Sequence, residues 1–248
     1  MEYVQRLYRT SMGKDRLRAF QIVVGESDLW IGVTPEVFDE RLIRAAEAAT
    51  VEARAQVRAE IARRPEFLTT LAPLASDGEA TTLVRGMCRA GERAGTGPMA
   101  AVAGAIAQAV GRQLVDAGGV REVIVENGGD LFVLSQEPVR ALVFAGPSPL
   151  SNRIGVILPG GGAPLGVCTS SGTVGPSLSF GEADAVMVAC EDAALADAWA
   201  TSLANRVRTA ADIAPTLELA GSRPEILSCV IVVGDRMGVC GRLELFVT

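Results

Sequence analysis

Residues 123–134 read VIVENGGDLFVL, and this stretch decides the fold because two apolar runs flank one tight turn. Val123–Val125 and Leu131–Leu134 are short and rich in residues that favour strands. The Asn-Gly-Gly sequence between them suits a turn with positive φ angles. We therefore predict an antiparallel hairpin that turns at Asn127–Asp130.

Further short apolar runs on both sides of this hairpin predict more strands. The runs that precede it are Leu7–Ser11, Phe20–Val24 and Leu29–Val33. Those that follow it are Arg140–Phe144, Ile154–Leu158, Leu165–Cys168, Ala185–Ala189, and a closing hairpin of Cys229–Val233 with Met237–Val247.

Helical patterns fall between these groups of strands. Thr34 and Pro35 are typical of a helix start, and apolar residues recur from Phe38 to Ile61 at three- and four-residue steps. Pro65 is expected to end that helix. Further helices are predicted over residues 98–117, which are unusually small, over about 192–206, and over about 209–220 with an interruption at Pro215.

Strands, helices, strands, helices and strands thus follow one another along the chain. This order is an α+β pattern rather than a βαβ alternation. We expect antiparallel sheets with paired helices, built as two similar halves that are interleaved. Because no Pro/Ser-rich linker divides the chain, we expect a single domain over residues 1–248.

Composition excludes several classes of function. The 248 residues include no histidine, so Ser-His-Asp and Cys-His nucleophiles and His-ligated metals are ruled out. With 23 Lys and Arg against 29 Asp and Glu, the net charge is −6, which argues against a nucleic-acid partner. The longest nearly apolar stretch, Pro98–Val110, is shorter than the roughly 20 residues that span a bilayer. The first ten residues lack the apolar core of a signal peptide, so we expect a cytoplasmic protein with no membrane partner.

The five cysteines include no C-x-x-C pair, so zinc and thioredoxin-like sites have no support. If Gly234 and Asp235 form a two-residue turn, Cys229 lies opposite Cys240 in a hydrogen-bonded pair. We expect these to be neighbouring reduced thiols rather than a disulfide.

A carboxylate and a hydroxyl lie one helical turn apart at Asp197 and Thr201. The neighbours of Asp197 on its helix face are alanines, which lets another backbone or a ligand approach closely. Two such oxygens can hold Mg²⁺, with water or phosphate completing the shell. The alternative is an ordinary polar stripe on a solvated helix.

Three other segments are candidates for ligand binding. The turn residues Asn127, Gly128, Gly129 and Asp130 allow close contact with the backbone, although a simple hairpin explains them equally well. Gly97, Pro98 and Met99 begin the small-residue helix, where free N–H groups attract anions, although any helix has such a start. The third segment follows an apolar strand and is a candidate pocket lining, and its residues are Cys168, Thr169, Ser170, Ser171 and Gly172. Cys168 is a candidate nucleophile or sulfur carrier, against the alternative of a buried inert thiol.

In their order and spacing, these motifs resemble the ApbE-like superfamily, whose founding members are flavin transferases. The resemblance rests on Gly119–Arg121, Glu126–Asp130, Thr169–Gly172 and Ala196–Thr201. The chain is similar above all to an uncharacterised ApbE-like family, through Glu26–Leu29 and Gly97–Ala107. The resemblance covers most of the chain.

The resemblance implies a T-fold-like architecture and assigns roles to individual residues. Asp197 and Thr201 match the family's Mg²⁺-binding pair, and Asn127, Gly128, Gly129, Ser171 and Gly172 match its contacts to flavin dinucleotide. It implies FAD or FMN and Mg²⁺ as cofactors, and a link of some relatives to sulfur assimilation favours Cys168 as a reactive thiol.

The chain departs from the transferases after the Ser-Gly loop. Their His-containing segment is replaced by Gly175–Glu182, which has no histidine. We therefore expect binding of a small anionic, flavin- or nucleotide-like ligand rather than flavin transfer to protein. The alternatives are a thiol-based sulfur carrier that uses Cys168 and a non-catalytic scaffold that forms a homo-oligomer.

Overall fold

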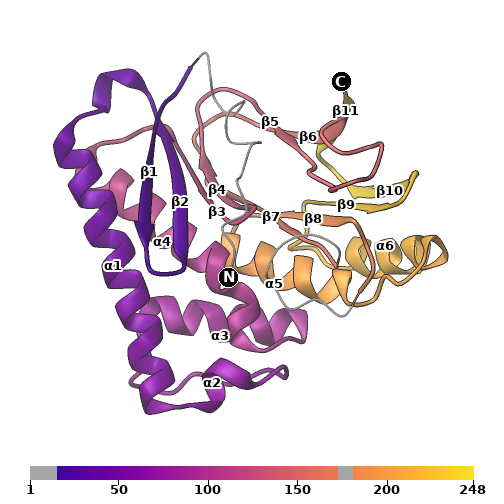
Figure 1. Ribbon diagram of the computed structural model, residues 1–248, viewed down its shortest axis with the longest axis horizontal. Helices are drawn as coiled ribbons and strands as arrows, with labels where there is room; N and C mark the ends of the chain where they lie inside the picture. Colours follow the sequence, from indigo (N-terminus) through magenta and orange to yellow (C-terminus); the bar gives the residue numbers. More distant parts are fainter. Residues whose placement is uncertain (1–15, 173–180) are drawn as a thin grey trace.

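The computed structural model describes residues 16–172 and 181–248. Its main feature is an antiparallel sheet of eight strands in the order β1-β2-β3-β4-β7-β8-β9-β10 (Figure 1). The strands are β1 (Arg18–Val24), β2 (Ser27–Val33), β3 (Val123–Asn127), β4 (Asp130–Leu134), β7 (Leu165–Ser170), β8 (Ala185–Cys190), β9 (Ser228–Val233) and β10 (Arg236–Gly241).

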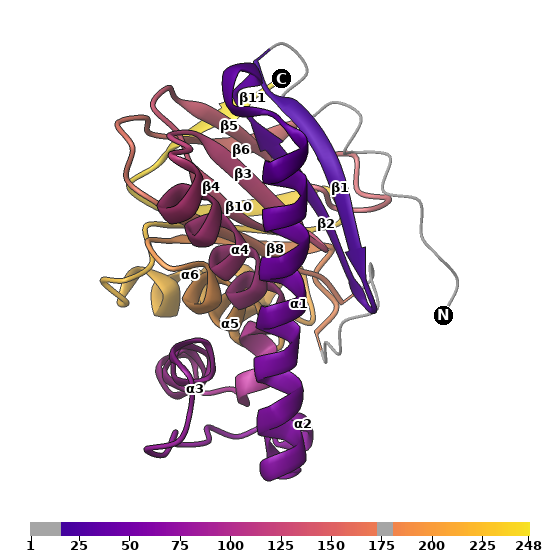
Figure 2. The same cartoon turned by 90° about the vertical axis from the view of Figure 1, so that its left-hand side faces the viewer.

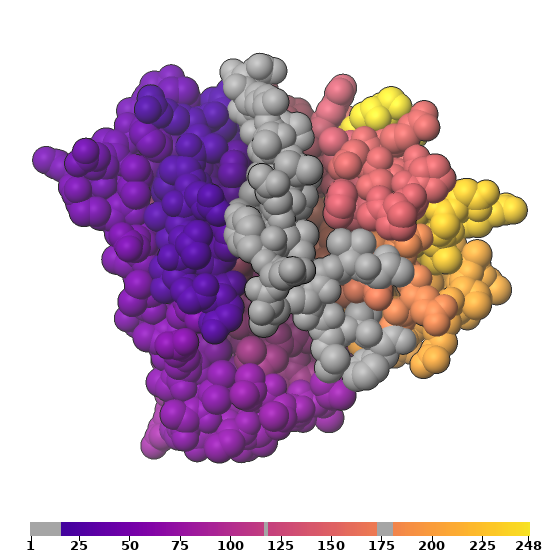
Figure 3. Space-filling model, viewed as in Figure 1, coloured from indigo at the N-terminus to yellow at the C-terminus, as the bar shows by residue number. Residues whose placement is uncertain are grey.

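The sheet consists of two halves with the same topology. In each half a hairpin is followed by helices and then by a second hairpin, and the inner strands of the two hairpins pair: β2 with β3, and β8 with β9. The halves join where β4 pairs with β7. In the space-filling view the N-terminal half lies at the left and the C-terminal half at the right (Figure 3). The prediction of an α+β protein with two similar halves is confirmed.

The helices cover one face of this sheet and a small sheet covers the other. The helices are α1 (Glu40–Arg63), α2 (Glu66–Thr69), α3 (Thr82–Ala94), α4 (Val102–Gly118), α5 (Ala193–Ala204) and α6 (Ile213–Gly221), with short 3₁₀ segments η2 (Pro35–Val37), η3 (Pro98–Ala101) and η4 (Ala210–Asp212). The small sheet has the order β11-β6-β5, formed by β5 (Val139–Leu142), β6 (Ile154–Leu158) and β11 (Glu244–Val247). Figure 2 shows the helices gathered on one side of the large sheet.

Alternating side chains of the large sheet supply both of these cores. On β8, Val186 and Val188 contact the helix side, whereas Ala185 and Met187 pack toward the small sheet. This period of two is the ordinary geometry of a strand. Since both faces are covered, every residue of β8 is buried. Polar groups that lie between these layers are therefore shielded from water.

The first helix begins later than predicted. Pro35 starts only the 3₁₀ segment η2, and Thr34 makes no side-chain cap. Helix α1 starts at Glu40, because the carboxylate of Asp39 accepts the N–H of Leu42 at 2.8 Å. Phe38 therefore precedes the helix instead of belonging to its apolar face.

Other boundaries also differ from the sequence prediction. Pro215 lies in the first turn of α6, where a missing N–H costs nothing, so the helix is not interrupted there. The strand after Met237 ends at Gly241, whose φ of +108° turns the chain into β11 of the small sheet. The strand predicted at Leu7–Ser11 lies outside the described residues. Among the described residues, no helix is both long and apolar enough to cross a membrane.

Candidate functional site

Two buried carboxylates meet where the halves of the sheet join. Asp130 begins β4 and Asp197 lies in the middle of α5, and they are 7% and 9% exposed. Burial, followed by the charge of nearby Asp197, raises the pKa of Asp130 well above its usual range. Burial also raises the pKa of Asp197 to about 7. Both shifts show that the pair lies in surroundings that disfavour negative charge.

Asp197 reaches the N-terminus of helix α4. Its Oδ2 accepts the backbone N–H of Gly104 at 2.9 Å, and the N–H of Ala103 also donates to its side chain. These are free N–H groups of the first helical turn, so the carboxylate caps α4 from a different helix. The two helices come this close because Gly104 has no side chain: a Cβ there would lie 2.3 Å from the carbonyl oxygen of Ala193. The alanines around Asp197 thus admit the backbone of α4, as the sequence suggested.

Asp130 is held at the end of β7 but keeps one oxygen free. The thiol of Cys168 and the backbone N–H of Thr169 hydrogen-bond to its side chain. Its Oδ1 is buried and has no partner in the part of the chain that the structure describes. Since a buried acceptor without a partner is costly, this oxygen marks a place for a proton or a cation.

The predicted hairpin turn lies against the same cluster. Asn127 pairs with Asp130, and Gly128 and Gly129 have φ angles of +73° and +103°. The side-chain amide of Asn127 donates to the carbonyl of Ala103 at 3.1 Å, which ties the turn to α4. The nearest atom to a Cβ built on Gly129 is the carbonyl oxygen of Thr169 at 3.9 Å, so the turn lies beside the end of β7.

Cys168 is part of the cluster but is not exposed. Its single S–H proton has two acceptors within reach, the carbonyl oxygen of Ala193 at 3.3 Å and the side chain of Asp130, and its side chain has no exposed surface. Burial, followed by the charge of Asp130, raises the pKa of this thiol well above its usual range. Since the thiolate is the nucleophile, the structure gives no support to Cys168 as a catalytic or sulfur-carrying residue.

The rest of the predicted loop follows β7 toward the chain near Ala183. Ser170 is buried at the end of the strand, Ser171 donates its hydroxyl to the carbonyl of Ala183 at 3.5 Å, and Gly172 donates its N–H to the same oxygen at 2.9 Å. A Cβ on Gly172 would clash with the carbonyl oxygen of Gly181. Of the segment Gly175–Glu182, only Gly181 and Glu182 belong to the described residues.

Gly97, Pro98 and Met99 do not form the helix start that the sequence suggested. Pro98 and Met99 belong to the 3₁₀ segment η3, and α4 begins only at Val102. Gly97 is packed against the backbone of Thr70, where a Cβ would have no room. The free N–H groups of α4 are those of Ala103 and Gly104, and Asp197 already accepts them. Segment η3 still packs against α5, but the anion site predicted at Met99 gains no support.

The two carboxylates could supply only part of the ligand shell of a hard cation. No ion pair with Arg or Lys is formed by Asp130 or Asp197 within residues 16–172 and 181–248. No three His, Cys, Asp or Glu side chains among those residues converge as a complete metal site. Mg²⁺ is commonly held by one or two carboxylates, with water and phosphate as its other ligands. Thr201 follows Asp197 by one helical turn of α5 and is half-buried.

Two residues that help to build this site had no role assigned from the sequence, although Glu126 belongs to the motif Glu126–Asp130. Glu126 is 1% exposed, and its Oε1 accepts the N–H of Gly129 at 2.7 Å. Gln108 on α4 donates to Asp192 at 2.7 Å and accepts the N–H of Ala193 at 2.8 Å, which fixes the start of α5. The signal for Gln108 was a single polar residue within an otherwise apolar run.

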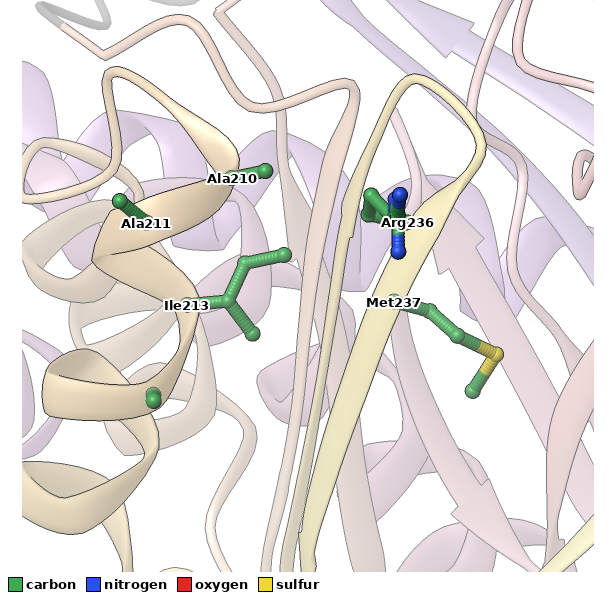
Figure 4. A pocket seen from close by; sticks show the side chains of 6 residues that line it. Ala210, Ala211, Ile213, Arg236 and Met237 are labelled. Carbon is green, nitrogen blue, oxygen red and sulfur yellow. The ribbon is translucent and has the colours of Figure 1, made fainter.

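A groove at the edge of the large sheet contains none of these residues. It runs between α6 and β10 and is lined by Ala210, Ala211, Ile213, Ala214, Arg236 and Met237 (Figure 4). The groove is shallow and its only charged side chain is that of Arg236. It adds no group to the carboxylate cluster.

Comparisons with known proteins agree with the fold. A flavin transferase ApbE from Vibrio cholerae superposes with a TM-score of 0.60 at 12% identity, over 91% of this chain and 96% of that one. An apo flavinyl transferase ApbE from Pseudomonas stutzeri gives 0.54 at 15% identity, over 91% and 94%. At these identities the likeness shows a shared architecture, which confirms the predicted ApbE-like fold.

Sequence relatives define the family. A UPF0280 protein of Methanocella arvoryzae is 43% identical over 194 residues, which are 78% of each chain. One of Methanoculleus marisnigri is 44% identical over 204 residues, which are 82% of each chain. A family model described as AbpE bacteria matches residues 9–220. The chain therefore belongs to this ApbE-like family, together with the UPF0280 proteins.

Proposed function

We propose that this protein binds a flavin- or nucleotide-like ligand through Mg²⁺ at the joint between its two halves. The observation that carries the proposal is the buried pair Asp130 and Asp197, which has raised pKa values, a free buried oxygen and no basic partner among the described residues. A divalent cation would compensate both charges, and Mg²⁺ in such a site characteristically takes phosphate oxygens as further ligands. Asp197 and Thr201 are its proposed protein ligands, with Asp130 beside them.

Residues around the hairpin turn would position the ligand. Gly128 and Gly129 present bare backbone at the hairpin turn, where a flat or extended ligand can lie close. Asn127 holds that turn against α4 by its bond to Ala103, so the turn keeps its position relative to Asp197. Ser171 and Gly172 border the same region. When bound, Mg²⁺ would neutralise phosphate charge and orient the ligand.

Binding, rather than transfer of flavin to protein, suits this chain. The chain has no histidine that could act as the base that activates a hydroxyl acceptor. The buried thiol of Cys168, whose pKa is raised, does not supply that base either. The solved structures that share the fold are described as flavin transferases. FAD is therefore the first ligand to test, followed by FMN and ADP, which separate its two halves.

The test is calorimetric titration of the purified protein with FAD, FMN and ADP, in MgCl₂ and in EDTA. We expect one of these ligands to bind in MgCl₂ and at least tenfold more weakly in EDTA. Asp197→Asn keeps an oxygen that can cap α4 but removes the charge, so it should fold normally and lose the Mg²⁺ dependence. Asp235→Asn, at the exposed turn of the edge hairpin, is the matched control and should bind as wild type does.

Two results would contradict the proposal. If Asp197→Asn binds as tightly as wild type and responds equally to Mg²⁺, the carboxylate only caps a helix and the metal site lies elsewhere. If none of the three ligands binds in either buffer, the proposed ligand class is wrong.

A further inference from the structure

A second group of reactive side chains lies at the edge of the large sheet. Cys229 on β9 and Cys240 on β10 are direct partners in the hairpin register, as the sequence predicted. Both contact the core on the helix side of the sheet, so the two thiols project from the same face. Directly opposed residues in an antiparallel pair have Cα atoms about 4.5–5.5 Å apart, within the range that a disulfide spans.

The two thiols differ in their access to solvent. Cys229 is fully buried, whereas Cys240 is partly exposed on β10, the last strand of the described sheet. They hydrogen-bond to each other, and both are free thiols. Cys240 can therefore react with a reagent from solution, and the thiol of Cys229 lies next to it.

The hydrogen bond also shifts the pKa values of the two thiols in opposite directions. It lowers the pKa of Cys240 to about 7, and the same bond, together with burial, raises the pKa of Cys229. Burial raises the pKa values of Cys88 and Cys190 as well. Cys240 is thus the thiol most readily ionised, and it is also the one that solvent reaches.

We propose that Cys229 and Cys240 are a redox-modification site, closed reversibly to a disulfide by peroxide or by a small disulfide such as oxidised glutathione. With hydrogen peroxide, the Cys240 thiolate attacks one oxygen, which gives a sulfenic acid and, after protonation, water. The sulfur of Cys229 then attacks the Cys240 sulfur, releases its proton and expels a second water. Two thiols and one peroxide become one disulfide and two waters, and a thiol reductant reverses the change.

This site is independent of the carboxylate cluster. In the row across the sheet, Val188 lies between Cys168 and Cys229. Cys168 is hydrogen-bonded to Ala193 and Asp130, on the far side of that valine. Oxidation of the two thiols and binding of Mg²⁺ therefore concern separate sites, and each can be tested without the other.

Peptide mapping tests directly whether Cys229 and Cys240 form a disulfide. Trypsin cleavage at Arg208, Arg236 and Arg242 places Cys229 in residues 209–236 and Cys240 in residues 237–242, because the Arg223–Pro224 bond resists the enzyme. Reduced full-length protein is treated with one equivalent of hydrogen peroxide, or with oxidised glutathione, and unreacted thiols are alkylated after denaturation. We expect the two peptides to be linked in most molecules, to separate after dithiothreitol, and all other cysteines to be alkylated.

Variants separate this prediction from general oxidation. Cys229→Ser should leave Cys240 as a stable mixed disulfide with glutathione, Cys240→Ser should leave Cys229 alkylatable, and the control Cys88→Ser should form the link normally. The proposal is overturned if wild-type Cys240 accumulates as the glutathione adduct or as a sulfinic acid while Cys229 remains alkylatable. A link from Cys240 to residues 154–206, or to a second copy of the chain, would also overturn it.

Discussion

The hairpins β3–β4 and β9–β10 occupy equivalent places in the two halves of the molecule, yet their surroundings differ completely. Each is the second hairpin of its half and turns over two residues, Gly128-Gly129 in one and Gly234-Asp235 in the other. The first lies in the middle of the sheet between β2 and β7, and the second lies at its edge. Local structure is therefore nearly constant while burial changes.

The difference teaches that position in the sheet, rather than the turn, makes the candidate site. At the joint, the carboxylates of Asp130 and Asp197 are buried and their pKa values rise. At the edge, Asp235 is 81% exposed and pairs loosely with Arg236 at 3.6 Å. The same kind of polar turn is a potential ligand site in one place and ordinary surface in the other.

The largest expected effect concerns the glycines that let helices approach the two regions. Gly104→Ala should destabilise the protein by about 3 kcal/mol, because the new Cβ would meet the backbone of Ala193, which cannot move away. Gly238→Ala on β10 meets side-chain methyl groups of Ile213 and Leu217 rather than backbone, so its cost should be smaller, about 1 kcal/mol. Urea unfolding of both variants gives the comparison. Equal losses would show that the joint is no more rigid than the edge.

The next effect is a pH dependence that only the joint should have. Without Mg²⁺, the folded protein keeps protons on Asp197 up to about pH 7, whereas the ordinary value for the unfolded chain is 3.8. The folded state thus binds more protons between these values, so its free energy of unfolding should fall as the pH rises from about 4 through 7. We expect a loss on the order of 2 kcal/mol, measured by urea unfolding at pH 5 and pH 8 in EDTA.

Two variants isolate the source of that slope. Asp197→Asn should reduce it by the contribution of Asp197 and leave that of Asp130, whose pKa is also raised. Asp235→Asn at the edge turn should keep the slope unchanged. Added Mg²⁺ should restore stability at pH 8 in the wild type but not in Asp197→Asn, since the ion requires the ionised carboxylate. A slope in Asp197→Asn as steep as that of the wild type would assign the titration to other groups.

Much of the fold follows from short-range chemistry in the sequence. The two-residue turns at Gly128-Gly129 and Gly234-Asp235 fix every pairing in their hairpins, including Cys229 with Cys240. Short-range chemistry did not predict the start of α1 correctly, because Thr34-Pro35 and Asp39 are both good start signals within six residues. Only the contact of Asp39 with Leu42 decides between them, and sequence pattern alone does not rank the two.

The candidate site could be predicted only in pieces. Asp197 was identified by its small neighbours and Asp130 by its turn, but their meeting depends on the pairing of β4 with β7 and on α5 packing beneath both. Those contacts join residues far apart in the chain, so no local pattern contains them. The helix start expected near Met99 failed for the same reason: the N–H groups of α4 that matter are those that Asp197 reaches from another helix.

A third prediction compares the helix caps of the two regions. Gln108 bonds to Asp192 and to the N–H of Ala193 at the joint, so Gln108→Ala should cost about 1.5 kcal/mol by removing two partly buried hydrogen bonds. Asp212 caps η4 through Thr209 near the edge. Its hydrogen bonds are exposed to solvent, so Asp212→Ala should cost clearly less. Thermal unfolding measures both. A larger loss for Asp212→Ala would contradict the view that the joint carries the stability.

The smallest expected effect compares the two turns themselves. Gly234 has a φ of +59°, a left-handed conformation that Asn adopts readily, and it uses only its backbone to bond Asp184 and Ser148. Gly234→Asn should therefore change stability by less than about 0.5 kcal/mol. Gly129 has a φ of +103°, beyond the left-handed region that Asn prefers, so Gly129→Asn should cost about 1 kcal/mol more. Urea midpoints resolve that difference. If the two variants are equally stable, the φ angle of Gly129 puts no strain on an asparagine and the two turns are equally tolerant.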